Sequence, residues 1–262
     1  MIINEKKTVE LFHRNEAGET MVNIYYGCDL VCPYCYWQVD DSWAGQITVY
    51  TDVAERLESE IHTLPQGTKV SLGWKGNPYS SIEKEYGLTR KCLEILIDNG
   101  MDITVSASRG NDIILRDMDL LTRKDAKIKV LIEMTRLDIV KTFNETGTHV
   151  SFEVANEIKK NGVEIVTTVS PVLPGITDVE KMAAALPNIP VHIAKLDIRP
   201  NTAWGDNTIA FIKDEYPNLL DKYLKIQRTG VDPYYESLAT KYKDGSGQIK
   251  PFLPFWDEIP EA

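Results

Sequence analysis

CDLVCPYC, residues 28–35, contains three of the chain's four cysteines. Their spacing is Cys-x3-Cys-x2-Cys, and a strand-like run of residues 21–26 comes shortly before them. Three thiolates can bind three irons of a [4Fe–4S] cluster and leave the fourth iron open to another ligand. The stretch therefore predicts an iron–sulfur site on a loop after the first strand, with Cys28, Cys32 and Cys35 as metal ligands and catalytic core.

A structural zinc site is the main alternative for these cysteines. Such sites use four protein ligands, arranged in paired Cys-x2–4-Cys elements. The fourth cysteine, Cys92, falls in a helix-like run with Leu88 and Ile95 on the same face, which predicts a buried apolar position. His13 and His62 are 15 and 27 positions from the ends of the cysteine stretch. No fourth protein ligand is therefore evident, and the spacing favours the cluster.

The composition is that of an ordinary globular protein. The chain has 262 residues, 43% of them hydrophobic and 26% charged, which predicts one large domain or a domain with an extension. Residues 1–7 contain no apolar signal-peptide region, and no apolar run is long enough to span a membrane. We expect a cytoplasmic protein without a membrane partner, in a reducing compartment where a disulfide is disfavoured.

The negative charge is concentrated near the cysteines. The net charge is −10, and residues 1–65 carry 4 basic and 11 acidic side chains. No block of lysine and arginine occurs in the sequence. Since tight, sequence-independent DNA binding needs clustered cations, we expect duplex DNA to be an unlikely partner.

Strand-like and helical patterns alternate along most of the chain. The apolar runs predict six strands, at residues 21–26, 70–73, 102–107, 128–134, 164–169 and 191–198. Helices are predicted between them at residues 52–62, 88–98, 113–122, 152–160 and 177–186, the first and last opening on the capping boxes Asp52-x-x-Glu55 and Thr177-x-x-Glu180. This order indicates an α/β fold with parallel strands, and six units are too few to close an eight-stranded barrel.

We therefore predict an open, partial (β/α)6 barrel with a C-terminal extension. Residues 1–200 form the barrel core in this interpretation. The alternation stops after Arg199, and residues 201–262 are rich in tyrosine, tryptophan and phenylalanine. We expect this extension to pack over the barrel.

The triple-cysteine spacing, with the aromatic Tyr34 directly before the third cysteine, resembles the signature of the radical S-adenosylmethionine (SAM) enzymes. Four further segments resemble the spore photoproduct lyase-like branch of that superfamily: GNPY at 76–79, IEKEYGLTR at 82–90, DIILRD at 112–117 and PVLPGITD at 171–178. The resemblance covers residues 22–200. It implies a [4Fe–4S] cluster and SAM as cofactors, and an electron-donating partner such as flavodoxin or ferredoxin.

The chain departs from that branch in two places. Spore photoproduct lyase has Cys-x-x-Asp-Pro where this chain has WKGNP at residues 74–78, and its cysteine gives a hydrogen atom to the substrate radical. The resemblance therefore does not imply repair of spore photoproduct by that route. Many relatives have Thr-Lys-Ser after the third strand, whereas this chain has SRGN at residues 108–111 and keeps a basic group there.

A radical SAM site must bind SAM at the carboxyl ends of the strands, where ligands of such sheets lie. The backbone of residues 73–76 could meet the SAM amino group, and Arg109 its carboxylate. Glu133 and Thr135 could hold ribose hydroxyls. An unpaired buried carboxylate is costly, so Glu133 at the end of an apolar strand is expected to have a polar partner. The cofactor-binding candidates are Tyr34, Gly73, Lys75, Ser106, Ser108, Arg109, Glu133, Thr135, Ser170 and Pro171.

Substrate contacts are predicted nearby, at Tyr36, Trp37, Trp74, Asn77, Asp197, Arg199 and Trp204. Two alternatives remain open for the charged members. Arg109 could be a surface arginine, and Asp197 with Arg199 could form an ion pair that only fixes the exit of the sixth strand. The four histidines show no ligand spacing and are expected to be ordinary polar or core residues.

We therefore predict an enzyme that cleaves SAM reductively to a 5′-deoxyadenosyl radical, which takes a hydrogen atom from its substrate. The substrate is a small molecule, a nucleotide-derived compound or a peptide. The alternatives are a nucleic-acid base modification or repair enzyme and a non-enzymatic protein that binds zinc or carries electrons.

Overall fold

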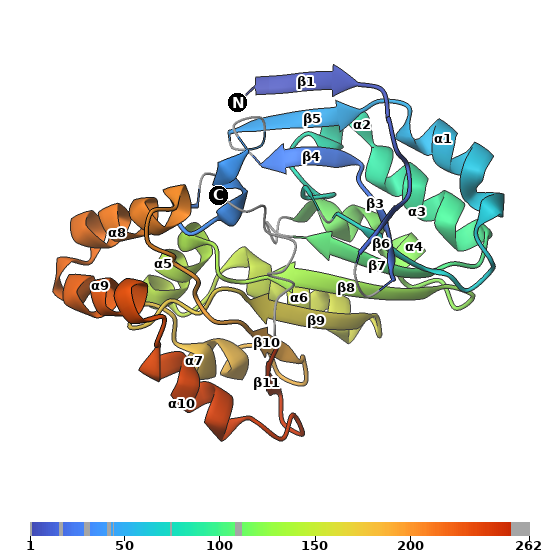
Figure 1. Ribbon diagram of the computed structural model, residues 1–262. Helices are drawn as coiled ribbons and strands as arrows, with labels where there is room; N and C mark the ends of the chain where they lie inside the picture. Colours follow the sequence, from blue (N-terminus) through green and yellow to red (C-terminus); the bar gives the residue numbers. More distant parts are fainter. Residues whose placement is uncertain are drawn as a thin grey trace.

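The computed structural model describes residues 2–15, 18–28, 32–40, 43, 45–73, 75–107 and 112–252. Its centre is an eight-stranded sheet with the order β11-β10-β9-β8-β7-β6-β3-β2 (Figure 1). The strands are β2 (His13–Arg14), β3 (Thr20–Val22), β6 (Lys69–Leu72), β7 (Asp102–Ala107), β8 (Lys127–Glu133), β9 (Glu164–Val169), β10 (Val191–Ile193) and β11 (Ile249–Pro251).

All neighbouring strands of this sheet run parallel except β2 and β3, which are antiparallel. The six predicted strand regions occur in the sheet in sequence order, in line with the tendency of successive strands to lie side by side. The fold is thus mixed α/β with a parallel sheet. The sheet does not close into a barrel, since β2 and β11 stand at opposite edges.

The predicted strand at residues 21–26 was wrong in its extent. It is two strands in two sheets: β3 belongs to the large sheet, whereas β4 (Tyr25–Cys28) joins a three-stranded sheet with β5 (Gln46–Tyr50) and β1 (Ile2–Lys6). The chain leaves the large sheet at Asn23, whose side chain accepts a hydrogen bond of 2.9 Å from the Lys75 N–H. The cysteine loop therefore follows β4.

Most predicted helices are present. They are α1 (Val53–Glu60), α3 (Leu88–Asp98), α6 (Val150–Lys160) and α7 (Val179–Ala184). Residues 113–122 form a 3-10 helix, η3 (Asp112–Asp117), followed by the short α4 (Met118–Leu121). The sequence did not predict α2 (Glu83–Tyr86) or α5 (Leu137–Thr146).

Both predicted capping boxes were wrong in detail. The Asp52 carboxylate accepts from the N–H and hydroxyl of Thr8 at 2.8 Å each, and makes no cap bond to α1. The cap of α7 is Asp178, which accepts from the Lys181 N–H at 2.9 Å. Thr177 lies one residue before it.

The described C-terminal residues form three α-helices, a short 3-10 helix, η4 (Pro217–Leu219), and a strand. The α-helices are α8 (Ala203–Glu215), α9 (Leu220–Thr229) and α10 (Pro233–Lys241), and β11 then joins the edge of the large sheet beside β10. Figure 1 shows α8 and α9 beside the carboxyl ends of β8 and β9. Trp204 and Tyr223 are fully buried, and the Tyr235 hydroxyl donates to the Ile193 carbonyl at 3.3 Å.

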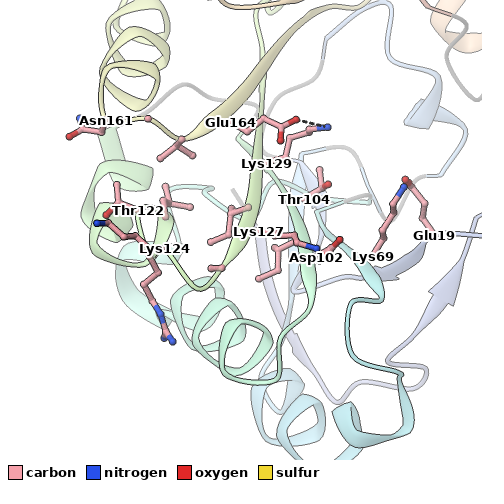
Figure 2. Close-up of a pocket in the computed structure, with 17 residues that line it drawn as sticks. Glu19, Lys69, Asp102, Thr104, Thr122, Lys124, Lys127, Lys129, Asn161 and Glu164 are labelled. Carbon is pink, nitrogen blue, oxygen red and sulfur yellow. Dashed lines mark ion pairs between the residues drawn. The ribbon is translucent and has the colours of Figure 1, made fainter.

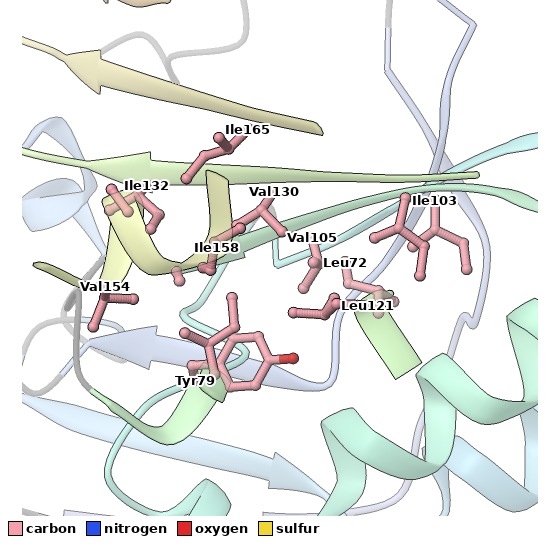
Figure 3. Close-up of a cluster of buried hydrophobic side chains, with 14 of the residues drawn as sticks. Leu72, Tyr79, Ile103, Val105, Leu121, Val130, Ile132, Val154, Ile158 and Ile165 are labelled. Carbon is pink, nitrogen blue, oxygen red and sulfur yellow. The ribbon is translucent and has the colours of Figure 1, made fainter. Parts of the chain in front are cut away.

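One face of the large sheet carries the main core. Alternate residues of β7, β8 and β9 are buried in register, with Val105 opposite Val130 and Val130 opposite Ile165. Figure 3 shows these side chains together with Leu121 and Ile158 of the covering helices. Cys92 of α3 is fully buried in the same cluster, which confirms its predicted core position. The intervening strand residues are left for the opposite, polar face.

Among the described residues, no helix combines the length and the apolar character needed to cross a membrane.

Candidate active site

The three cysteines lie at the junction of β4 and a short 3-10 helix, η1 (Tyr36–Val39). Cys28 ends β4: its N–H donates to the Trp43 carbonyl at 3.0 Å, and its carbonyl accepts from the Gly45 N–H at 2.8 Å. Cys32 and Cys35 flank a turn closed by the Cys35 N–H, which donates to the Cys32 carbonyl at 3.0 Å. None of the three forms a disulfide within the described residues, and all three are half-buried.

Two side chains fix the cysteine loop to distant elements. The buried Tyr34 donates its hydroxyl to the Thr135 carbonyl, just past the end of β8, at 3.1 Å. Gln38 donates to the carbonyls of Cys32 and Pro33 at 2.6 and 3.0 Å. It accepts in turn from the Asn207 side chain of α8. The loop is therefore held over the carboxyl end of β8, against the C-terminal helices.

Burial shifts the titration of this site. It raises the pKa of the Cys32 thiol to about 12, with the negative charge of Glu133 adding to the effect and the Tyr34 hydrogen bond opposing it. The pKa of Cys35 is raised for the same main reason. Burial also raises the pKa of Glu133 to about 7, although the nearby Arg136 guanidinium opposes the shift. Cys32, Cys35 and Glu133 thus share one electrostatic environment, in which metal binding must displace protons from the thiols.

The loop supplies three thiols as its donor set, and the described structure does not bring them together around one metal ion. In the described part of the chain, no three His, Cys, Asp or Glu side chains are close enough together to hold one metal ion. The loop offers three thiols, which suits a cubane with one open iron. Beside it, two donors are buried and have no partner among the described residues: Thr135 Oγ1 and Arg136 Nε. Such groups are expected where a polar ligand completes the site.

The ends of β6 and β7 approach each other closely. The Ser106 hydroxyl donates to the Gly73 carbonyl at 3.1 Å. Gly73 has a φ of +95°, and a Cβ there would lie 2.2 Å from Pro78 and 2.5 Å from Ser106. Only glycine fits this position. The backbone of Gly73 therefore lies at the strand end, where its carbonyl accepts from the Ser106 hydroxyl and its N–H donates to the Val22 carbonyl at 3.4 Å.

Lys75 joins the segment after β6 to the cysteine loop. Its carbonyl accepts from the Gly27 N–H and from the Trp43 indole, both at 3.0 Å. Its ammonium group lies 5.6 Å from the centre of the Trp37 ring. That ring stacks on the Trp43 ring with 6.0 Å between the ring centres, and its centre is 5.3 Å from that of the Tyr36 ring. The predicted candidates Lys75, Tyr36 and Trp37 are thus brought together.

The polar face of the sheet adds residues that sequence reasoning missed. Glu133 pairs in register with Thr168, and Thr168 with His192. These three lie in one row across β8, β9 and β10, beside Ser170 and Pro171 at the exit of β9. Strand periodicity could have placed Thr168 on the face of Glu133, but the register across strands was needed for His192.

Other predicted residues lie apart from this row. The Arg199 Nε is 2.8 Å from Asp197 Oδ2, so these two form the ion pair considered as their alternative role. Trp204 is 1% exposed, and its indole N–H has no partner within the described ranges. Asn77 accepts from the Tyr79 N–H at 3.1 Å. Trp74, Ser108 and Arg109 lie outside the described residues.

A buried ion network supports the loops after β6 and β7. The Glu83 and Asp117 carboxylates are fully buried, and Arg116 contacts both, at 2.7 and 2.8 Å. Arg90 also contacts Asp117, at 3.0 Å, and the Tyr79 hydroxyl donates to it at 3.2 Å. These residues lie in the segments 76–79, 82–90 and 112–117, which were singled out in the sequence. The three segments therefore have a structural role, because together they build this ion network.

A cavity of about 660 Å³ lies at the other end of the strands from the cysteine loop, where β6 to β9 begin (Figure 2). Its charged side chains are largely paired, Lys129 with Glu164 at 2.8 Å and Lys127 with Asp102 at 3.3 Å. The ends of α4 and α6 also line it, and cations near helix carboxyl ends are stabilising. We infer that the charged residues that line this cavity contribute to the stability of the fold.

The comparisons with known proteins bear on the fold. No family model matches the chain. An uncharacterized protein of Methanocaldococcus jannaschii is 26% identical over 171 residues, which cover 63% of this chain and 64% of the relative. The chain thus spans slightly less than two thirds of that relative's length.

Two solved structures share the architecture. Spore photoproduct lyase complexed with dinucleoside spore photoproduct matches with a TM-score of 0.57 and 15% identity, over 82% of this chain and 66% of that one. Streptococcus suis SuiB bound to S-adenosylmethionine matches with a TM-score of 0.54 and 13% identity, over 92% of this chain and 52% of that one. The fold is therefore similar to that of radical SAM enzymes.

Proposed function

We propose that this protein is a radical SAM enzyme that holds a [4Fe–4S] cluster on Cys28, Cys32 and Cys35. One observation carries the proposal. A loop with three thiols is fixed by Tyr34 and Gln38 over the carboxyl end of a parallel sheet, and the sheet shares its fold with an enzyme complex and with a SAM-bound protein.

A cluster held by Cys28, Cys32 and Cys35 would supply the single electron for reductive cleavage of SAM. The chain's own residues bind and orient SAM. The Gly73 backbone faces the amino group of its methionine part. Arg109 binds its carboxylate, and the buried cation of Arg136 is a second candidate for that role.

The adenosine half is assigned to the ends of β8 and β9. Glu133 accepts from ribose hydroxyls, and the Thr135 hydroxyl, which has no partner among described residues, donates to them. The backbone at Ser170 and Pro171 lies against adenine. Tyr34 is a buried residue of the loop itself, and its proposed role is to exclude water from the reacting region.

The substrate lies between the strand ends and the C-terminal helices, with residues 201–262 as a separate extension over the barrel core. Tyr36, Trp37, Trp74 and Asn77 are its proposed contacts, and a small molecule, a nucleotide-derived compound or a peptide is its proposed class. We do not extend to this chain the dinucleoside photoproduct in the lyase complex, because WKGNP replaces the cysteine-bearing frame at residues 74–78.

Anaerobic reconstitution with iron and sulfide tests the cluster assignment. We expect about four irons and four sulfides per chain, with the broad visible absorption of a [4Fe–4S] cluster. The same protein should bind SAM by calorimetry, and more tightly with the cluster than without it. Stoichiometric zinc with no sulfide would contradict the proposal and favour a zinc-binding module.

A further inference from the structure

A second cavity, of about 540 Å³, lies between the exit of β10 and the end of α9. Residues 195–200 form one wall and residues 226–230 the other. Its charged lining side chains are Lys195, Arg199 and Arg228, with one carboxylate, Asp197. A cavity with an excess of positive charge is unexpected in a chain whose net charge is −10.

The β10 exit presents two different faces. Leu196 and Ile198 are 2% and 3% exposed and belong to the hydrophobic cluster that contains Tyr34, against which Cys32 packs. Lys195 and Arg199, which alternate with them, are more exposed. Leu196 and Ile198 also line the cavity. The apolar cluster that contains Tyr34 therefore also contributes to the wall of the charged cavity.

The cations of this cavity are only partly engaged. Lys195 donates to the Gly230 carbonyl at the end of α9. Arg199 is 51% exposed and uses its Nε for Asp197, while its two terminal nitrogens have no partner among the described residues. Arg228 makes no hydrogen bond or ion pair within the described part of the chain. Two guanidinium groups thus face solvent at one cavity.

We propose that this surface, Lys195, Arg199 and Arg228, docks a negatively charged one-electron carrier protein. The inference rests on the proposed function, because each SAM cleavage requires one electron from outside. The carrier is oxidised by one electron and the cluster is reduced by one, and no proton or covalent bond is exchanged. Leu196 of the cavity wall and Tyr34 of the cysteine loop belong to one apolar cluster, which connects the docking surface with the proposed cluster site.

Charge explains why the surface is needed. A chain with a net charge of −10 repels an acidic carrier at long range, and a local patch of opposite sign restores steering and orients the encounter. A compact anion such as phosphate fits less well, because the Asp197 carboxylate stands among the cations. Spread, exposed arginines suit the several carboxylates of a protein surface.

The test is the rate of anaerobic cluster reduction, followed by stopped-flow absorbance with reduced flavodoxin or with dithionite. The variant is Arg199→Glu with Arg228→Glu. The matched control is Lys69→Glu with Lys124→Glu, the same charge change at exposed lysines of the cavity where β6 to β9 begin. We expect the arginine variant to slow reduction by flavodoxin about tenfold or more at low salt. Adding about 0.5 M NaCl should remove most of this difference.

Reduction by dithionite distinguishes the docking proposal from the enzyme proposal. It should reduce the cluster of all three proteins at rates within about twofold, since a small reductant needs no docking surface. Equal slowing of flavodoxin by both double variants, or no slowing by either, would overturn the docking proposal while leaving the enzyme proposal intact. So would saturable phosphate binding that the arginine variant loses while its flavodoxin rate is unchanged. A reconstituted protein whose cluster dithionite cannot reduce would instead contradict the proposed function.

Discussion

The Tyr34 hydroxyl donates a hydrogen bond of 3.1 Å to the Thr135 carbonyl, 101 positions further along the chain. This contact joins the cysteine loop to the end of β8, where Glu133 and Arg136 also lie. Both the aromatic residue of the cysteine motif and the proposed ribose-binding segment therefore depend on one buried interaction.

Replacing Tyr34 by Phe removes that hydrogen bond and leaves the Thr135 carbonyl without its partner. We expect a loss of about 1–3 kcal/mol in the free energy of unfolding, the usual penalty for an unsatisfied buried group. Urea denaturation of the apoprotein measures it. Cluster content after reconstitution should be retained, because the three thiols are unchanged. Unaltered stability would show that the bond contributes nothing.

Replacing Arg116 by Ala leaves the buried carboxylates of Glu83 and Asp117 without their shared cation. We expect a destabilisation of about 3–5 kcal/mol, as for a broken buried ion pair. Arg123→Ala is the matched control, since its pairs with Asp98 and Asp125 are exposed and should contribute about 0–1 kcal/mol. Similar losses in the two variants would contradict a special role for the buried network.

The raised pKa of Glu133 predicts a pH dependence of apoprotein stability. Its pKa is about 7 in the folded protein against an ordinary value of 4.5, so the folded state favours the protonated form. The protonated Glu133 carboxyl therefore contributes to the free energy of unfolding fully below about pH 4.5, and this contribution is lost as the pH rises through about 7. Glu133→Gln should flatten stability over this window in denaturation curves. An unchanged pH profile would place the titration elsewhere.

The two kinds of cysteine should respond differently to substitution. Cys32→Ala should abolish the visible absorption of the reconstituted cluster. Cys92→Ala should leave that absorption intact and destabilise the fold by about 1 kcal/mol, because Cys92 is a buried core residue. Loss of iron from the Cys92 variant would reverse the assignment of this residue to the core.

The central strands could be predicted from the sequence because each lies between helices and has apolar residues at alternate positions, as β7 and β8 do. The edge strands could not. β1 is mostly exposed, and β11 has three residues whose only strand partner is β10. The break at Asn23 depends on a tertiary bond to the Lys75 N–H, which no local pattern reports.

For the candidate site, too, the sequence predicted some of the residues and missed others. Cysteine spacing and strand ends predicted one site for Cys28, Cys32, Cys35 and Glu133, and the negative charge of Glu133 adds to the rise in the pKa of Cys32 and of Cys35 that burial causes. Gln38 and Arg136 were missed, because their significance lies in a contact to α8 and in a buried unpartnered nitrogen. Both properties exist only after folding.

The most direct test of the enzyme proposal is the appearance of 5′-deoxyadenosine when the reconstituted protein is incubated anaerobically with dithionite and SAM. Chromatography should detect it even without a substrate, because uncoupled cleavage needs only the reduced cluster and SAM. Cys32→Ala, treated identically, should give none. An intact, dithionite-reduced cluster that binds SAM and yields no 5′-deoxyadenosine, with or without candidate substrates, would contradict the account.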